Sequence, residues 1–288
     1  MHNTPDKQIH LTSPEAIADY YNSNTTRFLK LGGSGDVAAI HRAIWAPGVK
    51  NRTQAFLYLN QFIADALRPM LGNEPSAIHL LDLGCGVGGT ATWLAQTLGI
   101  RITGVTLSIE QVQLAKARAQ QLGLSAQVNF VLGDFSTPLH LPPAHAACAI
   151  ESFVHAENAK TFFEMVARHI QPGGRLIICD DFLNPPHNSR ALWWIKRFTQ
   201  GWHINNLLTT HSAIALAEAS GFRLVEKRDL SPWVQSFNPL LLWLVTTMTY
   251  IPLRWAYWKN LTGGAALQVC VKREWTTYQA ITLEKLAN

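Results

Sequence analysis

Two short stretches of the chain carry side chains that can accept protons. The first, AIESFVHAENA at 149–159, places Glu151 and His155 directly after an apolar run. A carboxylate can face a cation or take a proton, and an imidazole titrates near neutral pH. The second, ICDDF at 178–182, puts Asp180 and Asp181 at the end of another apolar run. We therefore expect proton-transfer chemistry, and no metal, because two adjacent aspartates offer too few oxygens for a hard cation.

A glycine-rich turn lies upstream of these groups. The stretch LLDLGCGVGGT at 80–90 ends an apolar strand pattern in Gly84, Gly86 and Gly88, and Gly89 gives an alternative spacing. Glycines let a ligand approach the backbone amides that open the next helix. The turn indicates a nucleotide-like ligand; the alternative is a turn that only tightens the connection between strand and helix.

Alternating strand and helix patterns must position these groups. Strands are expected near 78–83, 101–106, 128–132, 146–151 and 174–181, with helices at 89–98, 109–122 and 159–170 between them. A further helix is expected at 210–219 and further strands at 222–230 and 265–274. The alternation predicts a mostly parallel sheet with helices on both faces and ligands at the carboxyl ends of its strands. The first 75 residues and two aromatic segments are additions to this sheet.

Composition limits the classes of function. The 288 residues are 48% hydrophobic and 15% charged, and the net charge of +5 comes from scattered Lys and Arg without a basic block. We therefore expect a globular protein and no nucleic-acid partner. Four widely spaced cysteines indicate buried thiols in a reducing cytoplasm. The polar N-terminus predicts no secretion, and an apolar window from Pro239 is too short to span a membrane, although it suits an interfacial or cavity-lining helix.

The second predicted strand separates two classes of cofactor. A dinucleotide site needs an acidic residue at the end of that strand, where this chain has GVTLS. The chain instead resembles class I methyltransferases over about 60–275, in four ordered motifs: LLDLGCGVGG, GVTLSIEQVQLAKARA, VNFVLGDF and AIESFVHAENAKTFFEMVARHIQPGGRLIICDDF. The resemblance implies an α/β fold with a Rossmann-like, seven-stranded sheet and S-adenosyl-L-methionine as cofactor.

The same resemblance assigns residues to the cofactor. The glycine turn is expected to cradle the methionine part, and Asp134 to meet the adenine amino group, since a carboxylate accepts from an amine. The GVTLS and IEQ run is similar to that of tocopherol methyltransferases and cyclopropane fatty-acid synthases, which implies contacts with ribose and adenine; the alternative for Gln111 is the helix surface. The expected cofactor-binding residues are Asp82, Gly84, Gly86, Gly88, Thr106, Leu107, Ser108, Gln111, Asp134, Phe135 and Glu151.

A narrower resemblance bears on the reaction. Sterol C-methyltransferases carry a glutamate and HA pair like those of AIESFVHAENA, and geranyl diphosphate C-methyltransferases carry a similar glutamate. We therefore predict methylation of an alkene carbon in a terpenoid, sterol-like or prenylated acceptor, with Glu151 as base and aromatic side chains around the cation. The expected aromatic residues are Trp193, Trp194, Trp202, Trp233, Trp243, Trp255 and Trp258.

Other interpretations stay open. Glu151 could only bind the cofactor amine, and the tryptophans could only pack in the core. The alternative reaction is O- or N-methylation of a phenol or amine, with His155 or Asp181 as base. A third possibility is a domain that binds the cofactor without turnover.

The N-terminal segment is similar to the lid of small-molecule methyltransferases of the sterol and terpenoid type, in which a YY pair lies over the cofactor. We expect a lid or collar at 1–75 and a cofactor-binding core at 76–288, with substrate-pocket insertions at 182–208 and 231–263. Tyr20, Tyr21, His41 and Trp45 should line the lid or pocket, with Tyr21 among the catalytic residues. Alternatively, the segment only packs on the sheet, and Gly32, Gly33 and Gly35 then form a loop rather than a hinge.

The expected partner is a small hydrophobic substrate. The aromatic C-terminal third could also bury the interface of a homo-oligomer or touch a membrane surface.

Overall fold

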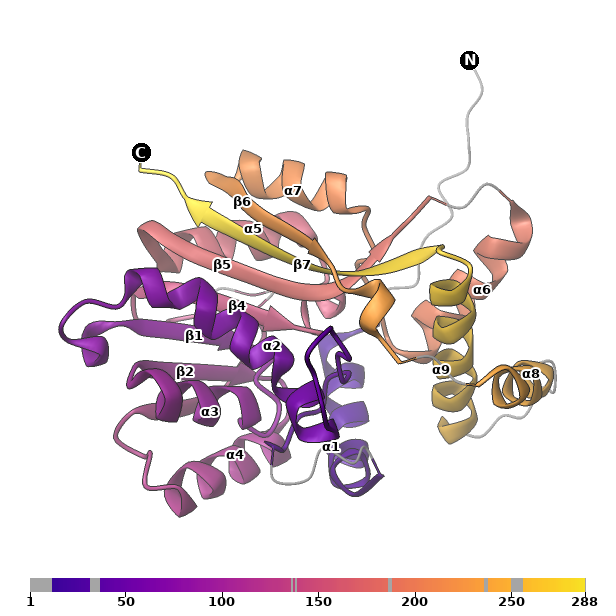
Figure 1. The fold of residues 1–288 in the computed structure, drawn as a ribbon, viewed down its shortest axis with the longest axis horizontal. Helices are drawn as coiled ribbons and strands as arrows, with labels where there is room; N and C mark the ends of the chain where they lie inside the picture. The colour runs from indigo at the N-terminus through magenta and orange to yellow at the C-terminus, as the bar shows by residue number, and fades with distance from the viewer. Residues whose placement is uncertain are drawn as a thin grey trace.

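Seven strands form one mixed sheet in the order β3-β2-β1-β4-β5-β7-β6 (Figure 1). The computed structural model describes residues 12–31, 37–135, 137, 139–185, 188–235, 238–249 and 256–287. The strands are β1 (His79–Leu83), β2 (Arg101–Thr106), β3 (Val128–Leu132), β4 (Ala144–Ile150), β5 (Ile170–Leu183), β6 (Phe222–Asp229) and β7 (Thr276–Lys285). β1 to β5 pair in parallel, while β7 pairs antiparallel with β5 and β6. The expected Rossmann-like, seven-stranded α/β fold is confirmed.

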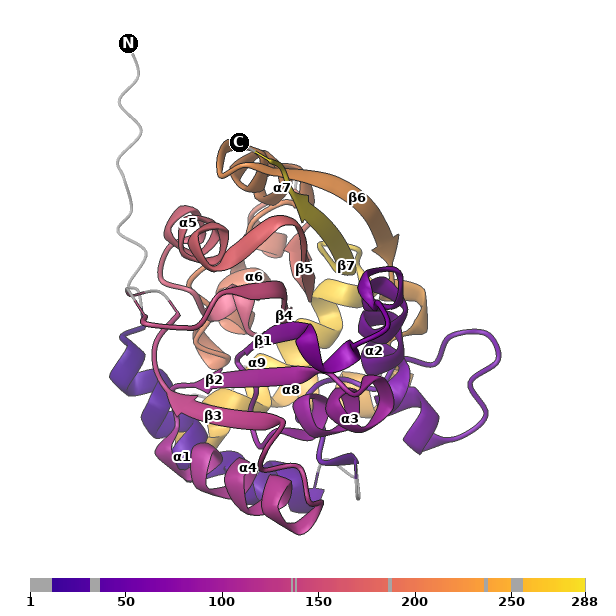
Figure 2. The same ribbon diagram turned by 90° about the vertical axis from the view of Figure 1, so that its left-hand side faces the viewer.

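Helices cover both faces of the sheet, as the alternating pattern predicted. One face carries α2 (Arg52–Leu67), α3 (Gly89–Leu98) and α4 (Ile109–Gln121), and the other carries α5 (Ala159–His169) and α7 (Thr210–Ala219) (Figure 2). Side-chain caps fix where several of these helices begin: the Ser108 hydroxyl accepts from Gln111 N–H, and Asn158 Oδ1 accepts from Lys160 N–H. β1 is buried along its whole length, and apart from His79 and Asp82 its residues are leucines, as is typical of a central parallel strand.

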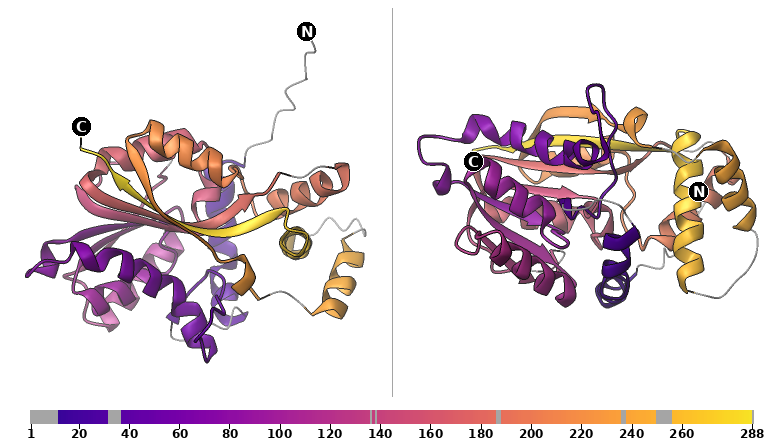
Figure 3. Two further views of the ribbon diagram at one scale, coloured as in Figure 1. Left: turned by 45° about the horizontal axis from the view of Figure 1, so that its top comes forward. Right: turned by 60° about the horizontal axis from the view of Figure 1, so that its bottom comes forward.

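Four more helices lie beyond the carboxyl ends of the strands. They are α1 (Pro14–Leu31), α6 (Ser189–Gly201), α8 (Pro239–Met248) and α9 (Ala256–Lys272). Figures 1 and 3 show α6, α8 and α9 together at one end of the molecule. Short 3-10 turns are η2 (Arg68–Met70), η3 (Pro75–Ala77), η4 (Phe153–His155) and η5 (Ser231–Trp233). The segments predicted to be insertions therefore gather at the edge of the sheet where ligands are expected.

The strand predicted at 265–274 is wrong, because that segment lies in helix α9 and in the turn after it. Its valines favour a strand locally, but the helix packs against α6 at a crossing of small residues. A Cβ placed on Gly263 would come within 2.8 Å of Gly201 Cα, so the two backbones are in close contact there. The last strand is β7, and Cys270 lies in a helix rather than in a strand.

Several sequence predictions fall outside the described residues. These are the polar N-terminal segment 1–11, the loop or hinge at Gly32, Gly33 and Gly35, Trp255, and the side chain of Trp258. All four cysteines are free and buried. Within the part of the chain that the structure describes, no helix combines the length and apolarity needed to cross a membrane.

Candidate active site

A pocket lies at the carboxyl ends of β1, β2, β4 and β5, closed by α1, the segment 38–42 and the α6–α9 pair. It brings together most of the predicted site residues, including Glu151, His155 and Tyr21. The lining residues are Ile17, Tyr20, Tyr21, Ala38, Ala39, Ile40, His41, Arg42, Asp82, Gly84, Cys85, Gly86, Val87, Gly89, Thr90, Thr106, Leu107, Gln111, Phe135, Ile150, Glu151, Ser152, Val154, His155, Asp180, Asp181, Phe198, Trp202, Ile204 and Leu267.

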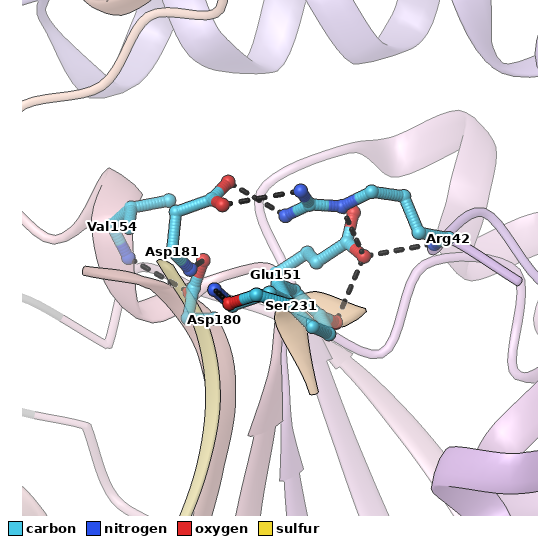
Figure 4. Close-up of polar contacts among 7 residues, drawn as sticks. Arg42, Glu151, Val154, Asp180, Asp181 and Ser231 are labelled. Atoms are coloured by element: carbon cyan, nitrogen blue, oxygen red, sulfur yellow. Dashed lines mark hydrogen bonds and ion pairs between the residues drawn. The ribbon is translucent and has the colours of Figure 1, made fainter. Parts of the chain in front are cut away.

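Arg42 joins the two acidic groups at the strand ends (Figure 4). Its Nη1 and Nη2 donate to the two carboxylate oxygens of Asp181 at 3.1 and 2.6 Å. Its backbone N–H and its Nε donate to Glu151 Oε1 at 2.8 and 3.2 Å. The Tyr278 hydroxyl donates to the same oxygen at 2.9 Å, and the guanidinium lies 4.1 Å from the centre of the Tyr278 ring. The segment around residue 42 is thereby tied to β4, β5 and β7.

These contacts set the protonation of the carboxyls. Burial alone would raise the pKa of Glu151, but the Arg42 charge and the hydrogen bonds from Arg42 and Tyr278 lower it. Burial raises the pKa of Asp181 in spite of its pairing with Arg42, and burial together with Asp181 raises the pKa of Asp180 further. Glu151 is therefore held ionised and is a weak proton acceptor.

The backbone at Glu151 is itself unusual. Its φ is +49°, in the left-handed region that a residue with a Cβ seldom adopts. Such strain persists only where surrounding contacts impose it, and it is frequent at functional sites. The residue follows β4 directly, and the turn directs its carboxylate toward Arg42.

Tyr21 and His155 form a second polar unit in the pocket. His155 Nδ1 lies 3.1 Å from the His203 carbonyl oxygen, which can only accept, so Nδ1 carries the proton. His155 Nε2 is then the acceptor for the Tyr21 hydroxyl at 3.1 Å. Burial lowers the pKa of His155 and raises that of Tyr21, so both groups are neutral near pH 7. An unprotonated imidazole nitrogen beside a hydroxyl can take up a proton.

His41 also lines the pocket. Its Nδ1 lies 3.1 Å from the Arg42 carbonyl oxygen, so Nε2 is again the unprotonated nitrogen. That Nε2 is buried and has no hydrogen-bond partner among the described residues, and burial lowers the pKa of the ring. The pocket therefore offers a ligand one unfilled acceptor at this position.

The glycine turn and Asp82 have the features of a ligand cradle. Asp82 is buried, its Oδ2 has no partner among the described residues, and burial raises its pKa to about 7. A Cβ on Gly86, where φ is +53°, would meet only Ile40 Cδ1 at 3.5 Å, so the backbone lies open to the pocket. S-Adenosylmethionine carries ammonium and hydroxyl donors that match an orphan carboxylate and an exposed glycine backbone. The residues present fit this cofactor.

The predicted cofactor contacts divide into two groups. Asp82, Gly84, Gly86, Thr106, Leu107, Gln111, Phe135 and Glu151 line the pocket, whereas Gly88, Ser108 and Asp134 do not. Gly88 and Ser108 are the N-caps of α3 and α4, and the Ser108 hydroxyl donates to Asn22 Oδ1 at 2.5 Å. For both groups a direct cofactor contact stays a prediction, and only the first group lies on the pocket wall.

Gln111 has a clear structural task. It is buried rather than on the helix surface, it accepts from the Thr106 hydroxyl at 2.6 Å, and its Nε2 donates to Thr25 Oγ1 at 3.1 Å. Because Thr25 belongs to α1, the side chain joins that helix to the end of β2.

The aromatic lining differs from the prediction. The pocket has Tyr20, Tyr21, Phe135, Phe198 and Trp202, so Trp202 is the one tryptophan among its lining residues in the described chain. Trp194 packs in the core between α6 and α9, Trp193 beside it, and Trp233 packs against Tyr58. Trp45 and Trp243 are exposed. Trp45 was expected on the lid or in the pocket, and it is not among the pocket-lining residues.

The sequence did not reveal Arg42 and Tyr278. Arg42 lies in an irregular segment without periodicity, and Tyr278 lies on a strand that was not predicted. The one available signal was indirect: two carboxylates at neighbouring strand ends require a cation when they are buried. Among the described residues, no group of three or more His, Cys, Asp or Glu could hold a metal ion.

Comparisons with known proteins agree with this geometry. A family model described as a methyltransferase domain matches residues 80–174. The O-methyltransferase rstn1 of Aspergillus nomiae is 33% identical over 167 residues, which are 56% of this chain and 72% of that protein. For the next two curated relatives the match spans only 57% and 62% of their length.

Solved structures share the fold over nearly the whole chain. The [4+2]-cyclase SpnF has a TM-score of 0.75 at 24% identity, covering 96% of this chain and 98% of that one. Geranyl diphosphate C-methyltransferase from Streptomyces coelicolor A3(2), in complex with Mg²⁺, geranyl diphosphate and S-adenosyl-L-homocysteine, has a TM-score of 0.69 at 18% identity, covering 95% and 98%. The glycine turn, the strand order and these matches agree, and the chain belongs to the class I S-adenosylmethionine-dependent methyltransferases.

Proposed function

We propose that this enzyme methylates a hydroxyl oxygen of a large apolar molecule, with His155 as the proton acceptor and Tyr21 as the group that binds the acceptor hydroxyl. The observation that carries the proposal is the tautomer of His155, whose Nδ1–H is donated to the His203 carbonyl. Nε2 is therefore unprotonated in the pocket, and burial keeps the pKa of the ring below its ordinary value. The relationship to a named O-methyltransferase supports the same reaction.

The cofactor supplies a methyl group bound to positively charged sulfur. The glycine turn, Asp82 and the ends of β2 and β4 would hold it. The oxygen of the Tyr21 hydroxyl can accept a hydrogen bond from the acceptor hydroxyl while its own proton is donated to His155 Nε2. The oxygen–carbon bond would form as the methyl carbon–sulfur bond breaks, and the sulfur would leave as a neutral sulfide. The acceptor proton would pass to Tyr21 and the Tyr21 proton to His155 Nε2. The proton thus ends on an imidazole, and Tyr21 returns to its neutral form.

The lining defines the class of acceptor. Beyond the polar groups, the pocket wall is largely apolar, and its part on α1 and near α6 and α9 includes Ile17, Phe198, Ile204 and Leu267, with Tyr20 and Trp202. Such a wall excludes water and binds hydrocarbon, so we infer a terpenoid, sterol-like or prenylated compound that bears a hydroxyl group.

A second candidate is methylation of an alkene carbon with Glu151 as base. It is favoured by the ionised Glu151 carboxylate in the pocket, which could face a carbocation, and by the likeness to a protein named geranyl diphosphate C-methyltransferase. Against it, Glu151 Oε1 already accepts three hydrogen bonds, and a carboxylate with a lowered pKa takes a proton poorly.

The test is to incubate the full chain with methyl-labelled S-adenosylmethionine and a panel of terpene alcohols, prenylated phenols and prenyl diphosphates, and to locate the label by NMR. We expect the label on oxygen. His155→Gln should lower kcat by about 10²–10⁴-fold while the cofactor Kd stays the same. Tyr20→Phe is the matched control for Tyr21→Phe, and only the second should lower kcat strongly. Label on carbon, with Glu151→Gln inactive and His155→Gln active, would establish the second candidate instead.

A further inference from the structure

Helix α8 presents an apolar face to solvent. Leu240, Trp243 and Leu244 are 75%, 63% and 49% exposed, and their spacing places them on one side of the helix. We call these three residues the α8 face. Leu242, on another side, is buried. Figures 1 and 3 show α8 outermost at the end of the molecule beyond the strands. A surface helix normally turns its polar side outward, so three large apolar side chains exposed together are unusual.

The hydroxyl groups of α8 are satisfied inside the helix. Thr246 and Thr247 of α8, and Thr249 just after it, donate to the carbonyl oxygens three residues earlier, at 2.9, 2.7 and 2.6 Å. Hydroxyls bonded in this way do not require water as a partner. The helix can therefore enter an environment of low polarity at little cost.

Charge is distributed unevenly between this end and the rest of the chain. The helices α6, α8 and α9 hold five of the 24 Lys and Arg and none of the 19 Asp and Glu. The rest of the chain carries 19 basic and 19 acidic residues, a formal charge of zero. Among the described basic side chains of these helices, Arg190, Lys196 and Lys272 are exposed. Three helices that carry only basic charges complement a negatively charged surface.

We propose that the α8 face docks on the surface of an anionic lipid bilayer. Tryptophan and leucine on one face of a helix insert at the boundary between headgroups and acyl chains, and nearby basic residues attract anionic headgroups over about 10 Å. Two copies of this chain that met through α6, α8 and α9 would bring five basic residues and no acidic residue of these helices against the same set, which disfavours a dimer as the occupant.

Docking through the α8 face would place the pocket near the bilayer, because α6 and α9 line the pocket and also lie beside α8 at this end of the molecule. Phe198 of α6 and Leu267 of α9 belong to the pocket lining, as does Trp202 at the end of α6. An apolar molecule dissolved in lipid could therefore reach the pocket through the same end of the protein. The docking itself does not depend on which atom receives the methyl group.

The experiment is co-sedimentation of the full chain with phosphatidylcholine vesicles, with and without phosphatidylglycerol. We expect binding to the anionic vesicles, weakened by salt. Trp243→Glu or Leu240→Glu should weaken it about tenfold, whereas Leu286→Glu, an exposed leucine at the end of β7, should not. Lys196→Glu should weaken it about fivefold or more, whereas Lys227→Glu on β6 should change it less than twofold.

Two outcomes would overturn the proposal. One is equal or absent binding to both kinds of vesicle. The other is a stable dimer of the full chain, measured by light scattering, that Trp243→Glu dissociates, since a second copy would then cover the α8 face. Circular dichroism of each variant keeps loss of binding separate from loss of folding.

Discussion

Replacing Arg42 by methionine should destabilise the folded protein by about 4 kcal/mol at pH 7. Removing one partner of a buried ion pair costs about 3–5 kcal/mol, because it leaves a charge without compensation. Here the side chains of Arg42, Glu151 and Asp181 are only 19%, 18% and 5% exposed, and one guanidinium serves both carboxylates. Methionine keeps most of the apolar volume, so the loss reports mainly on charge.

The effect should depend on pH in a defined direction. In the native protein the pKa of Glu151 is lowered, so its contribution to stability is present above its unfolded pKa and disappears as the pH falls through the folded value. Without Arg42, burial should raise the pKa values of Glu151 and Asp181, so the variant gains stability on acidification. The difference between the two proteins should therefore be largest near pH 7 and shrink toward pH 4.

Urea unfolding measured at several pH values is the assay, and Arg228→Met is the matched control. Arg228 also pairs with a carboxylate, that of Glu226, and lies 5.1 Å from the ring centre of Phe62, but its side chain is 43% exposed. An exposed pair contributes about 0–1 kcal/mol, so the control should lose little. If Arg42→Met costs no more than Arg228→Met, or if acid does not reduce the difference, the account of a buried ion-pair network is refuted.

Two further predictions concern the cofactor cradle. Burial raises the pKa of Asp82 to about 7, so the native protein loses folding stability as the pH rises from about 4 to about 7. The variant Asp82→Asn cannot ionise and does not have this loss. Without ligand it should therefore be as stable as the native protein at pH 4 and more stable by roughly 2–4 kcal/mol at pH 8. Thermal unfolding of both proteins between pH 4 and pH 8 measures this difference in stability. Calorimetry should show that Asp82→Asn binds the cofactor more weakly than the native protein. A stability difference that does not change with pH would contradict the raised pKa of Asp82. A Cβ on Gly89 would lie 2.5 Å from the Ala38 carbonyl oxygen, so Gly89→Ala should displace the segment over the turn, cost about 1–3 kcal/mol and speed proteolysis within 37–46. The control is Gly72→Ala, which has open space around it and should change neither stability nor the rate of proteolysis. Equal cleavage rates in Gly89→Ala and Gly72→Ala would argue against the contact between Gly89 and Ala38.

The core of the fold could be predicted because its signals are local. The strands from β1 to β5 are largely apolar runs bounded by turns, and apolar residues recur every three to four positions in the helices between them, so local patterns alone give the succession of these elements along the chain. The failure at 265–274 has the opposite cause. Valines in that segment favour a strand, but contact with α6 through Gly201 and Gly263 fixes a helix, and no window of sequence contains that contact.

The candidate site likewise has features that follow from local sequence and features that depend on distant contacts. The sequence by itself determined that Asp82, Glu151 and Asp181 stand at the carboxyl edge of one sheet, because parallel strands end on the same side and each residue closes an apolar run. Only the tertiary structure decided that Arg42 lies between Glu151 and Asp181, which are 109 and 139 residues away from it. It likewise decided that Tyr21 meets His155 across 134 residues. Such pairs form because burial forces each polar group to find a partner, and the partner depends on which distant segments the packed core brings together.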